Sequence, residues 1–220
     1  MDGIIIVDKP TGMTSHDVVS RVRRKLNMRR VGHAGTLDPL ATGVLIMLIG
    51  KSTKLFDRFV AFDKAYAATL RLGTQTTSAD ITGEVIENKP FDYVSRLQIE
   101  EVLHGFVGES EQMPPMVSAV KYKGERLYKL ARKGITVERP ARKIRIDVLK
   151  LIDCQLPEVK FYLECSKGTY VRTLAEDVGV KLGCGACITQ IQRTRIGHFS
   201  IDDAVKLEDL NESHVRRWPG

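Results

Sequence analysis

The stretch GVLIMLIG, residues 43–50, is a continuous apolar run between two glycines. An unbroken apolar run of this length is typical of a strand that is covered on both faces. We therefore expect residues 44–49 to form a buried strand, and the segments on either side of it to supply the rest of the fold.

The segment directly before this strand, GHAGTLDPLATG at residues 32–43, has the composition of a tight loop. It contains three glycines, a proline and two threonines, which disfavour a helix or a central strand. A rigid loop on a core strand can hold a reactive group in fixed geometry, and Asp38 is the candidate. The alternative is an Asp-Pro turn in which the carboxylate only bonds its own backbone. For an isolated Asp-Pro pair this alternative is favoured.

Hydrophobic periodicity predicts strands and helices along the rest of the chain. Strands are indicated by β-branched or alternating apolar residues at 4–7, 66–72, 144–148, 159–165 and 188–199. Helices are indicated by apolar residues at helical spacing at 14–26, 95–108, 171–183 and 202–210. Thr14 and the capping box of Ser95 and Gln98 begin the first two helices, and Gly108 is a natural stop for the second. In the 66–72 strand, the alternation places Tyr66 on the inward face with the leucines.

The order of these elements decides the fold class. Strands and helices do not alternate strictly, so the sequence predicts an α+β fold in which a mixed, largely antiparallel central sheet carries flanking helices. No repeat or clear linker occurs, and residues 1–220 are expected to form one domain. The four cysteines are expected to be buried thiols, because the CxxC pair of Cys184 and Cys187 lacks the second pair that a zinc site would use.

The charge of the chain indicates a polyanionic partner. The formal net charge is +7, and Lys and Arg side chains that neutralise phosphates release condensed counterions. Residues 21–30 carry six arginines or lysines and no acidic residue, a block that would repel itself unless an anion lies nearby. A solvated face is the alternative. Neither a leader pattern nor a membrane-spanning apolar stretch occurs, so a cytoplasmic location is expected.

A second basic segment follows two prolines, at about residues 112–145. Pro114 and Pro115 indicate an excursion from the sheet, and between Lys121 and Lys150 eleven Lys or Arg residues face three acidic ones. Tyrosines lie between these charges, a pattern that suits phosphate contact and stacking on unpaired bases. A solvated charged loop is the alternative. The basic side chains expected to bind RNA here are Lys121, Arg126, Arg132 and Arg142.

A third segment of interest, residues 165–172, lies where a predicted strand gives way to a helix. If the chain is still extended at 170–172, Tyr170 and Arg172 point to the same side. An arginine in a low-dielectric cleft needs a carboxylate, and Asp38 is a candidate that such a pairing would keep ionised. The alternative is a surface arginine at the start of a helix, which the spacing alone favours.

Taken together, these motifs resemble the TruB family, the tRNA pseudouridine-55 synthases. The sequence DKPTGMTS at residues 8–15 is similar to the opening motif of the family, and residues 32–43 are similar to its catalytic motif. Further matches follow in the order of the family and cover essentially the whole chain. They are Lys64-x-Tyr66, Leu72-Gly73, Asp80-x-x-Gly83, the Pro115/Ser118/Lys121 segment and residues 165–172.

The resemblance implies isomerisation of uridine 55 in the TΨC loop of tRNA, without a metal or a cofactor. Asp38 matches the essential aspartate, which acts as a nucleophile on a base that has been flipped out of the loop. The resemblance gives Arg172 the role of orienting Asp38, Tyr66 that of stacking on the base and assisting proton transfer, and His33 that of helping the flip. The residues expected to line the pocket or support it are Tyr170, Ile191 and Lys9, together with Pro10.

Two other readings of the same residues stay open. One is an RNA-binding or tRNA-folding factor on this fold, although such a protein has no reason to keep Asp38, Tyr66 and Arg172 together. The other is a hydrolase or metal enzyme using His33 and Asp38, which the absence of H-x-x-x-H spacing disfavours. The chain ends at Gly220 without room for the small PUA-type RNA-binding domain that bacterial members of the family usually carry, and a monomer is expected.

Overall fold

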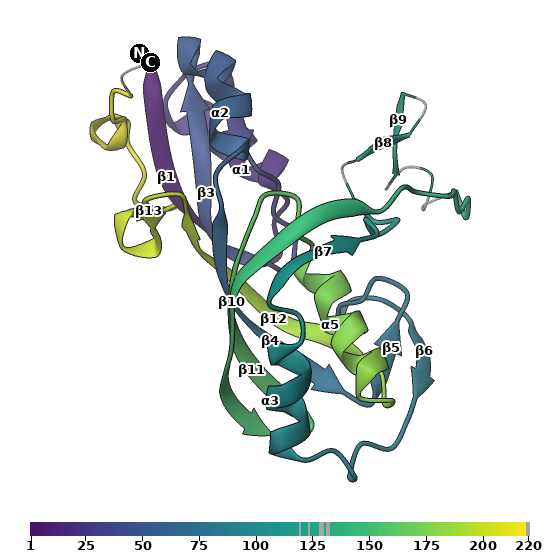
Figure 1. Cartoon of the computed structure of the whole chain (residues 1–220). Helices are drawn as coiled ribbons and strands as arrows, with labels where there is room; N and C mark the ends of the chain where they lie inside the picture. Colours follow the sequence, from purple (N-terminus) through teal and green to yellow (C-terminus); the bar gives the residue numbers. More distant parts are fainter. Residues whose placement is uncertain (119, 123, 128–129, 131–132, 219–220) are drawn as a thin grey trace. The chain divides into compact units, whose positions relative to one another are not determined.

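The computed structural model describes residues 1–118, 120–122, 124–127, 130 and 133–218 (Figure 1). The chain divides into two compact units. Unit 1 comprises Met1–Ala67 and Gln190–Gly220, and unit 2 comprises Ala68–Thr189. Strands β4 (Lys64–Leu72) and β12 (Ala186–Ile196) each contribute residues to both units. No helix within the described ranges is long and apolar enough to cross a membrane.

In unit 1, the strands follow the order β14-β1-β3-β12, with β2 paired to β3 and β13 paired to β12. The strands are β1 (Gly3–Lys9), β2 (Val31–Ala34), β3 (Thr42–Ile49), β13 (Phe199–Ser200) and β14 (Val205–Lys206). Strand β1 runs antiparallel to β3, whereas β14 is parallel to β1 and β12 is parallel to β3. The helical elements are α1 (Ser15–Lys25), α2 (Phe56–Val60) and 3-10 turns at Gly50–Leu55, Ile201–Asp203 and Glu212–His214.

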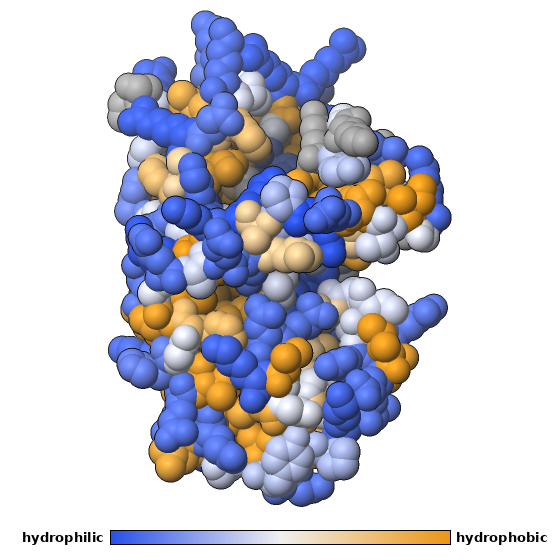
Figure 2. All heavy atoms as spheres, turned by 45° about the vertical axis from the view of Figure 1, so that its right-hand side comes forward, coloured by the Kyte–Doolittle hydropathy of each residue, from blue (hydrophilic) through white to orange (hydrophobic). Residues whose placement is uncertain are grey.

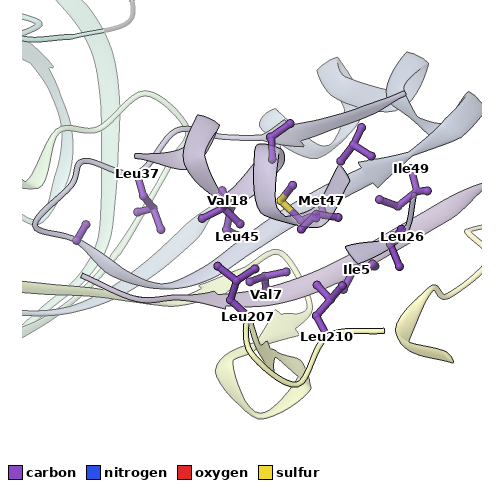
Figure 3. Packing of buried hydrophobic residues seen from close by; sticks show 14 residues of the cluster. Ile5, Val7, Val18, Leu26, Leu37, Leu45, Met47, Ile49, Leu207 and Leu210 are labelled. Carbon is purple, nitrogen blue, oxygen red and sulfur yellow. The ribbon is translucent and has the colours of Figure 1, made fainter. Parts of the chain in front are cut away.

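Strand β3 is buried on both faces, as its sequence predicts. Leu45, Met47 and Ile49 lie in a core cluster with the apolar stripe of α1, and Figure 3 shows these side chains with Val18 of that helix and Leu26, its C-cap residue. The alternate residues, 44, 46 and 48, belong to a second cluster with Phe59. Helix α1 begins where the sequence predicts, because Thr14 caps it and forms a capping box with Asp17.

In unit 2, the strands follow the order β4-β11-β10-β7, and the pairs β10–β11 and β10–β7 are antiparallel. The strands are β5 (Thr74–Thr76), β6 (Val85–Asn88), β7 (Gly108–Gln112), β10 (Arg142–Gln155) and β11 (Glu158–Cys165). Helix α3 (Arg96–His104) packs against β10, and α5 (Val171–Lys181) buries Leu174 and Val178. The mixed, largely antiparallel sheet with flanking helices confirms the predicted fold class.

The segment between β7 and β10 extends away from the sheet, and its two ends lie next to each other. Gln112, the last residue of β7, pairs directly with Arg142, the first residue of β10. Between them, β8 (Lys121–Tyr122) and β9 (Glu125–Arg126) form a separate two-stranded sheet, and Figure 1 shows this hairpin apart from β7 and β10.

Three local predictions were wrong. Residues 32–34 belong to β2 and not to a loop, because they pair with the far end of β3. Helix α3 ends at His104 with Gly105 as its C-cap, and Gly108 instead opens β7 at a φ of 114°. The predicted helix at 202–210 is a single 3-10 turn, since Val205 and Lys206 pair with β1 as strand β14.

Candidate active site

Asp38 lies in unit 1 on a loop whose backbone is fixed at six consecutive carbonyls. Two of the six, those of Gly35 and Thr36, accept hydrogen bonds from the Arg193 guanidinium, at 3.0 Å from Nη2 and 3.4 Å from Nη1. The carbonyl of Asp38 accepts from the amide of Ala41 at 3.1 Å, which closes a turn around the aspartate. The predicted loop is thus confirmed at residues 35–41, because β3 already begins at Thr42, and these hydrogen bonds hold its backbone in place.

The segment from Lys9 to Ser15, the first residue of α1, holds the other three carbonyls. Ser15 is buried, and its hydroxyl both accepts from the amide of Leu37 at 2.9 Å and donates to the Leu37 carbonyl at 3.2 Å. The Pro39 carbonyl accepts from the amide of Gly12 at 2.8 Å and from Lys9 Nζ at 3.4 Å. The Leu40 carbonyl accepts from the Thr11 hydroxyl at 3.2 Å. The motif at residues 8–15 therefore acts as a clamp on the loop.

Two cations are buried beside Asp38. Lys9 is fully buried, and its ammonium also donates to the Pro10 carbonyl at 2.8 Å. Burial lowers the pKa of Lys9 to about 8, although the nearby Asp38 carboxylate acts in the opposite direction. Burial likewise lowers the pKa of Arg193 from its ordinary value, and Tyr66 and Asp38 oppose that change. Both charges favour the ionised form of Asp38 by Coulomb attraction.

Tyr66 is buried on the inward face of β4, as the alternation predicted. Tyr66 is one of the groups that act on Arg193, where it opposes the lowering of the Arg193 pKa by burial. His33 is half-buried on β2, where it pairs with Met47 of β3, and Ile191 packs against the α1 core cluster. Unit 1 therefore holds five of the predicted site residues, Lys9, His33, Asp38, Tyr66 and Ile191.

Arg172 lies in unit 2, in the first turn of α5, with only 4% of its surface exposed. It donates to the carbonyls of Ser78 at 2.7 Å and Val117 at 2.8 Å, and its Nη1 is 3.6 Å from Oδ2 of the equally buried Asp80. The alternative of a surface arginine at a helix start is excluded by this burial. The expected pairing of Arg172 with Asp38 stays a prediction.

Tyr170 is the N-cap residue of α5. Its amide donates to Gln112 Oε1 at 2.8 Å and its carbonyl accepts from Gln112 Nε2 at 3.1 Å, so this backbone is tied to the end of β7. Tyr170 is extended, but the helix starts at Val171, so the chain does not stay extended through Arg172. The argument that placed Tyr170 and Arg172 on one side of a strand therefore does not apply.

The predicted RNA-binding side chains are only partly described. Arg142 is exposed at the start of β10, and Lys121 and Arg126 pair through their backbones in the β8–β9 hairpin. Arg132 lies outside the described residues. In unit 1, Arg21, Arg24 and Lys25 are exposed along or at the end of α1. The face in Figure 2 is mostly hydrophilic, with hydrophobic residues in separate patches.

Three buried polar residues were missed by the sequence reasoning. Ser15 was seen only as part of a helix start, Asp80 only as part of a motif, and Arg193 not at all. Arg193 lies two residues after Ile191, on the same face of a predicted strand. A charged residue on this apolar face was the signal that could have identified it. Within the described part of the chain, no three His, Cys, Asp or Glu side chains come together as a metal site.

The mixed, largely antiparallel sheet and the clamped aspartate loop agree with the pseudouridine synthase fold and motif that the sequence predicts. Residues 23–171 match the TruB family pseudouridylate synthase (N terminal domain), and residues 172–217 match the tRNA pseudouridylate synthase B C-terminal domain. The chain belongs to the TruB family.

Relatives and solved structures agree with this assignment. The chain is 50% identical to tRNA pseudouridine synthase B of Opitutus terrae, over 96% of this chain and 87% of that protein. It is 48% identical to the protein of the same name from Syntrophotalea carbinolica, over 96% of this chain and 69% of that one. Among solved structures, a chain of a Cbf5-Nop10-Gar1 complex is 32% identical with a TM-score of 0.74, and the match covers 94% of this chain and 53% of that one. The present chain thus spans about half the length of that chain.

Proposed function

We propose that this protein isomerises uridine to pseudouridine in tRNA, and that its target is uridine 55 in the TΨC loop. Family membership and the clamped Asp38 loop support the activity. The single observation that carries the chemistry is the position of Asp38 beside Lys9 and Arg193, on a backbone fixed at every carbonyl from Gly35 to Leu40. The chain acts as a monomer in the cytoplasm.

The reaction breaks the C1′–N1 bond, turns the uracil, and joins C1′ to C5. The hydrogen on C5 is then lost as a proton and N1 takes up another, so that substrate and product are isomers. Asp38 supplies a nucleophilic carboxylate, which must be ionised and correctly oriented when the flipped base arrives. A fixed loop meets the second requirement, and the neighbouring cations favour the first.

The remaining site residues complete the proposal. On the resemblance to the family we assign Arg172 the role of orienting Asp38, and Tyr66 those of stacking on the uracil and proton transfer. On the same ground we assign His33 to the flipping of the base, and Tyr170 and Ile191 to its binding. Basic side chains of α1 and of the segment from Lys121 to Arg142 bind the phosphates.

A tritium-release assay tests the function. With tRNA that carries tritium at C5 of uridine, the unmutated chain is expected to release tritium, and a tRNA lacking uridine 55 is expected to release none. Asp38→Asn is expected to abolish release while RNA affinity stays within a few-fold, because asparagine is nearly isosteric and cannot act as the carboxylate nucleophile.

The matched control is Asp57→Asn, which changes an exposed aspartate of the same unit and should leave release unchanged. Release by Asp38→Asn at close to the unmutated rate would overturn the assignment of the nucleophile. Release from the tRNA that lacks uridine 55 would overturn the assigned position. The factor that only folds tRNA, which the sequence left open, is not favoured, because RNA binding alone gives no reason for a nucleophile clamped in this way.

A further inference from the structure

We propose that unit 1 holds a second RNA-binding surface, at the end of strand β3 that is farthest from the Asp38 loop. This far-end surface binds the duplex that continues beyond the TΨC stem of the tRNA. The inference rests on the proposed function and deepens it, since it concerns a further part of the RNA that the chain holds. The surface consists of exposed cationic side chains: Arg29, Arg30, Lys51, Lys54 and Arg58.

The far-end surface and the Asp38 loop lie at opposite ends of β3. The strand starts at Thr42, directly after the loop, and it runs to Ile49, where the 3-10 turn with Lys51 and Lys54 follows. Seven residue steps from Thr42 to Ile49, at about 3.3 Å each, give a separation of about 23 Å. An RNA that touches both places must therefore extend well beyond the loop that carries the target base.

Two segments that are distant in the sequence form the far-end surface. Lys51, Lys54 and Arg58 share one side of the continuous helical stretch made by the 3-10 turn and α2. They do so because residues three apart in a 3-10 turn, or four apart in an α-helix, lie on the same side. Arg30 is bound to this turn, since its Nε donates to the Thr53 hydroxyl at 2.9 Å.

The backbone that carries the two arginines is held in place. The carbonyl of Arg30 accepts a hydrogen bond from the amide of Gly50 at 2.8 Å. The carbonyl of Val31, the next residue, accepts from Arg23 Nη2 at 2.9 Å. Arg29 and Arg30 therefore extend from an ordered main chain, so that binding a phosphate costs side-chain freedom but little backbone freedom.

The far-end surface has an excess of positive charge. Its segments carry two exposed carboxylates, Asp2 and Asp57, against the five cations. Asp2 accepts a hydrogen bond from the Lys51 amide at 2.6 Å, which lowers its pKa, and the charges of Lys51 and Arg30 lower it further. Across the described residues, no carboxylate forms an ion pair with any of the five cations. Like charges held this close repel one another, and a bound polyanion removes that repulsion.

Helix α1 carries further cations in the direction of the far-end surface. Its first residue, Ser15, bonds Leu37 of the Asp38 loop, whereas Leu26 at its other end shares a core cluster with Val31 at the start of β2. The helix therefore runs from the loop toward the far end of β3. The exposed cations along or at the end of the helix are Arg21, Arg24 and Lys25.

Distance and charge together favour duplex RNA as the occupant. Base pairs advance by at most about 3.4 Å along a duplex axis, so a separation of about 23 Å corresponds to at least about seven base pairs. The TΨC stem is shorter than this, and in tRNA the acceptor stem stacks on it and continues the duplex. Lys and Arg contacts to phosphates hold a duplex whatever its base sequence, which suits a surface of exposed cations.

The test measures the binding of two RNAs without turnover. One is a hairpin of the TΨC stem and loop alone, and the other is the same hairpin with its stem extended by the acceptor stem. The unmutated chain is expected to bind the extended hairpin at least about tenfold more tightly at low salt. In the variant Lys51→Gln/Lys54→Gln/Arg58→Gln this advantage should disappear, and the salt dependence for the extended hairpin should lose a slope of about 3. The affinity for the short hairpin should stay unchanged, which also shows that the variant is folded.

The matched control is Lys150→Gln/Lys160→Gln/Lys206→Gln, which removes the same charge from exposed lysines elsewhere and should keep the advantage of the extended hairpin. Equal affinities of the unmutated chain for the two hairpins would overturn the inference. An equal loss of the advantage in both variants would overturn it as well, because net charge alone would then be the cause. Tritium release with equal affinities would contradict this inference alone, whereas tighter binding of the extended hairpin without tritium release would contradict the proposed reaction.

Discussion

The hydroxyl of Ser15 offers a direct test of whether the Asp38 loop is clamped. Ser15→Ala removes both bonds to Leu37, the residue before Asp38, and leaves a buried amide and a buried carbonyl without that partner. A net hydrogen bond contributes about 1 kcal/mol, and a buried polar group left unsatisfied costs about 1–3 kcal/mol. The gain in helix propensity from serine to alanine offsets about 0.5 kcal/mol. We expect the free energy of unfolding to fall by about 2–4 kcal/mol.

The single tryptophan, Trp218, reports on the unfolding of unit 1, the unit that contains Ser15. Trp218 packs against Phe59 of unit 1 with ring centroids 5.4 Å apart, so its fluorescence in a urea titration follows the unit that contains Ser15. In Ser15→Ala the midpoint urea concentration should fall, whereas the dependence of the unfolding free energy on urea should stay unchanged. Single-turnover tritium release should slow by up to about 100-fold with RNA affinity unchanged, because a misplacement of about 1 Å is enough for such a loss.

Ser20→Ala is the matched control, since Ser20 is half-buried on the same helix and should tolerate alanine. A loss of less than about 0.5 kcal/mol in Ser15→Ala, or equal losses in the two variants, would show that the clamp contributes nothing to stability. Unchanged turnover in a destabilised Ser15→Ala would show that loop rigidity is not needed for the chemistry.

Three further predictions concern the same site. Because burial lowers the pKa of Lys9 from 10.5 to about 8, the folded chain binds fewer protons than the unfolded chain between these values, and its stability should rise with pH across that interval by up to about 3 kcal/mol. Urea titrations should show a smaller rise of stability with pH in Lys9→Met. An unchanged rise in that variant would assign the pH dependence to another group. Gly43→Ala should yield little folded protein, because a Cβ there would overlap the backbone of Arg193. Gly12→Ala, with φ of 79° and open space around it, should lose only about 1–2 kcal/mol of folding stability. Similar yields of folded protein for the two variants, measured by circular dichroism, would refute the close approach of Gly43 to Arg193. RNA affinity should fall steeply and linearly with the logarithm of salt concentration, and a flat dependence would exclude the basic segments as the phosphate contacts.

The sequence predicts those parts of the fold that depend on local pattern. Strand β3 and helix α1 are placed correctly because an unbroken apolar run and a capping box are readable within a few residues. The helix predicted at 202–210 fails for the opposite reason. Its residues pair in parallel with β1, which lies almost two hundred residues earlier in the chain, and no local signal reports such a pairing.

The same distinction holds for the candidate site. Asp38 and Tyr66 are identifiable because the loop composition and the strand alternation are local. The groups that hold them in place are distant, since Arg193 contacts Gly35 across 158 positions and Ser15 contacts Leu37 across 22. A hydrogen bond from a side chain to a carbonyl far away in the sequence produces no recognisable spacing of residues along the chain. The resemblance to the family identified the reactive groups, and the structure adds their supports.

These supports also bear on how Asp38 can act. A general acid needs a carboxyl group that keeps its proton near neutral pH, which apolar burial or a second carboxylate would favour. Asp38 instead has Lys9 and Arg193 beside it, and both cations stabilise the charged form. Buried cations around one carboxylate on an immobile loop therefore favour attack by an ionised aspartate over acid catalysis, and they do so independently of the family to which the chain belongs.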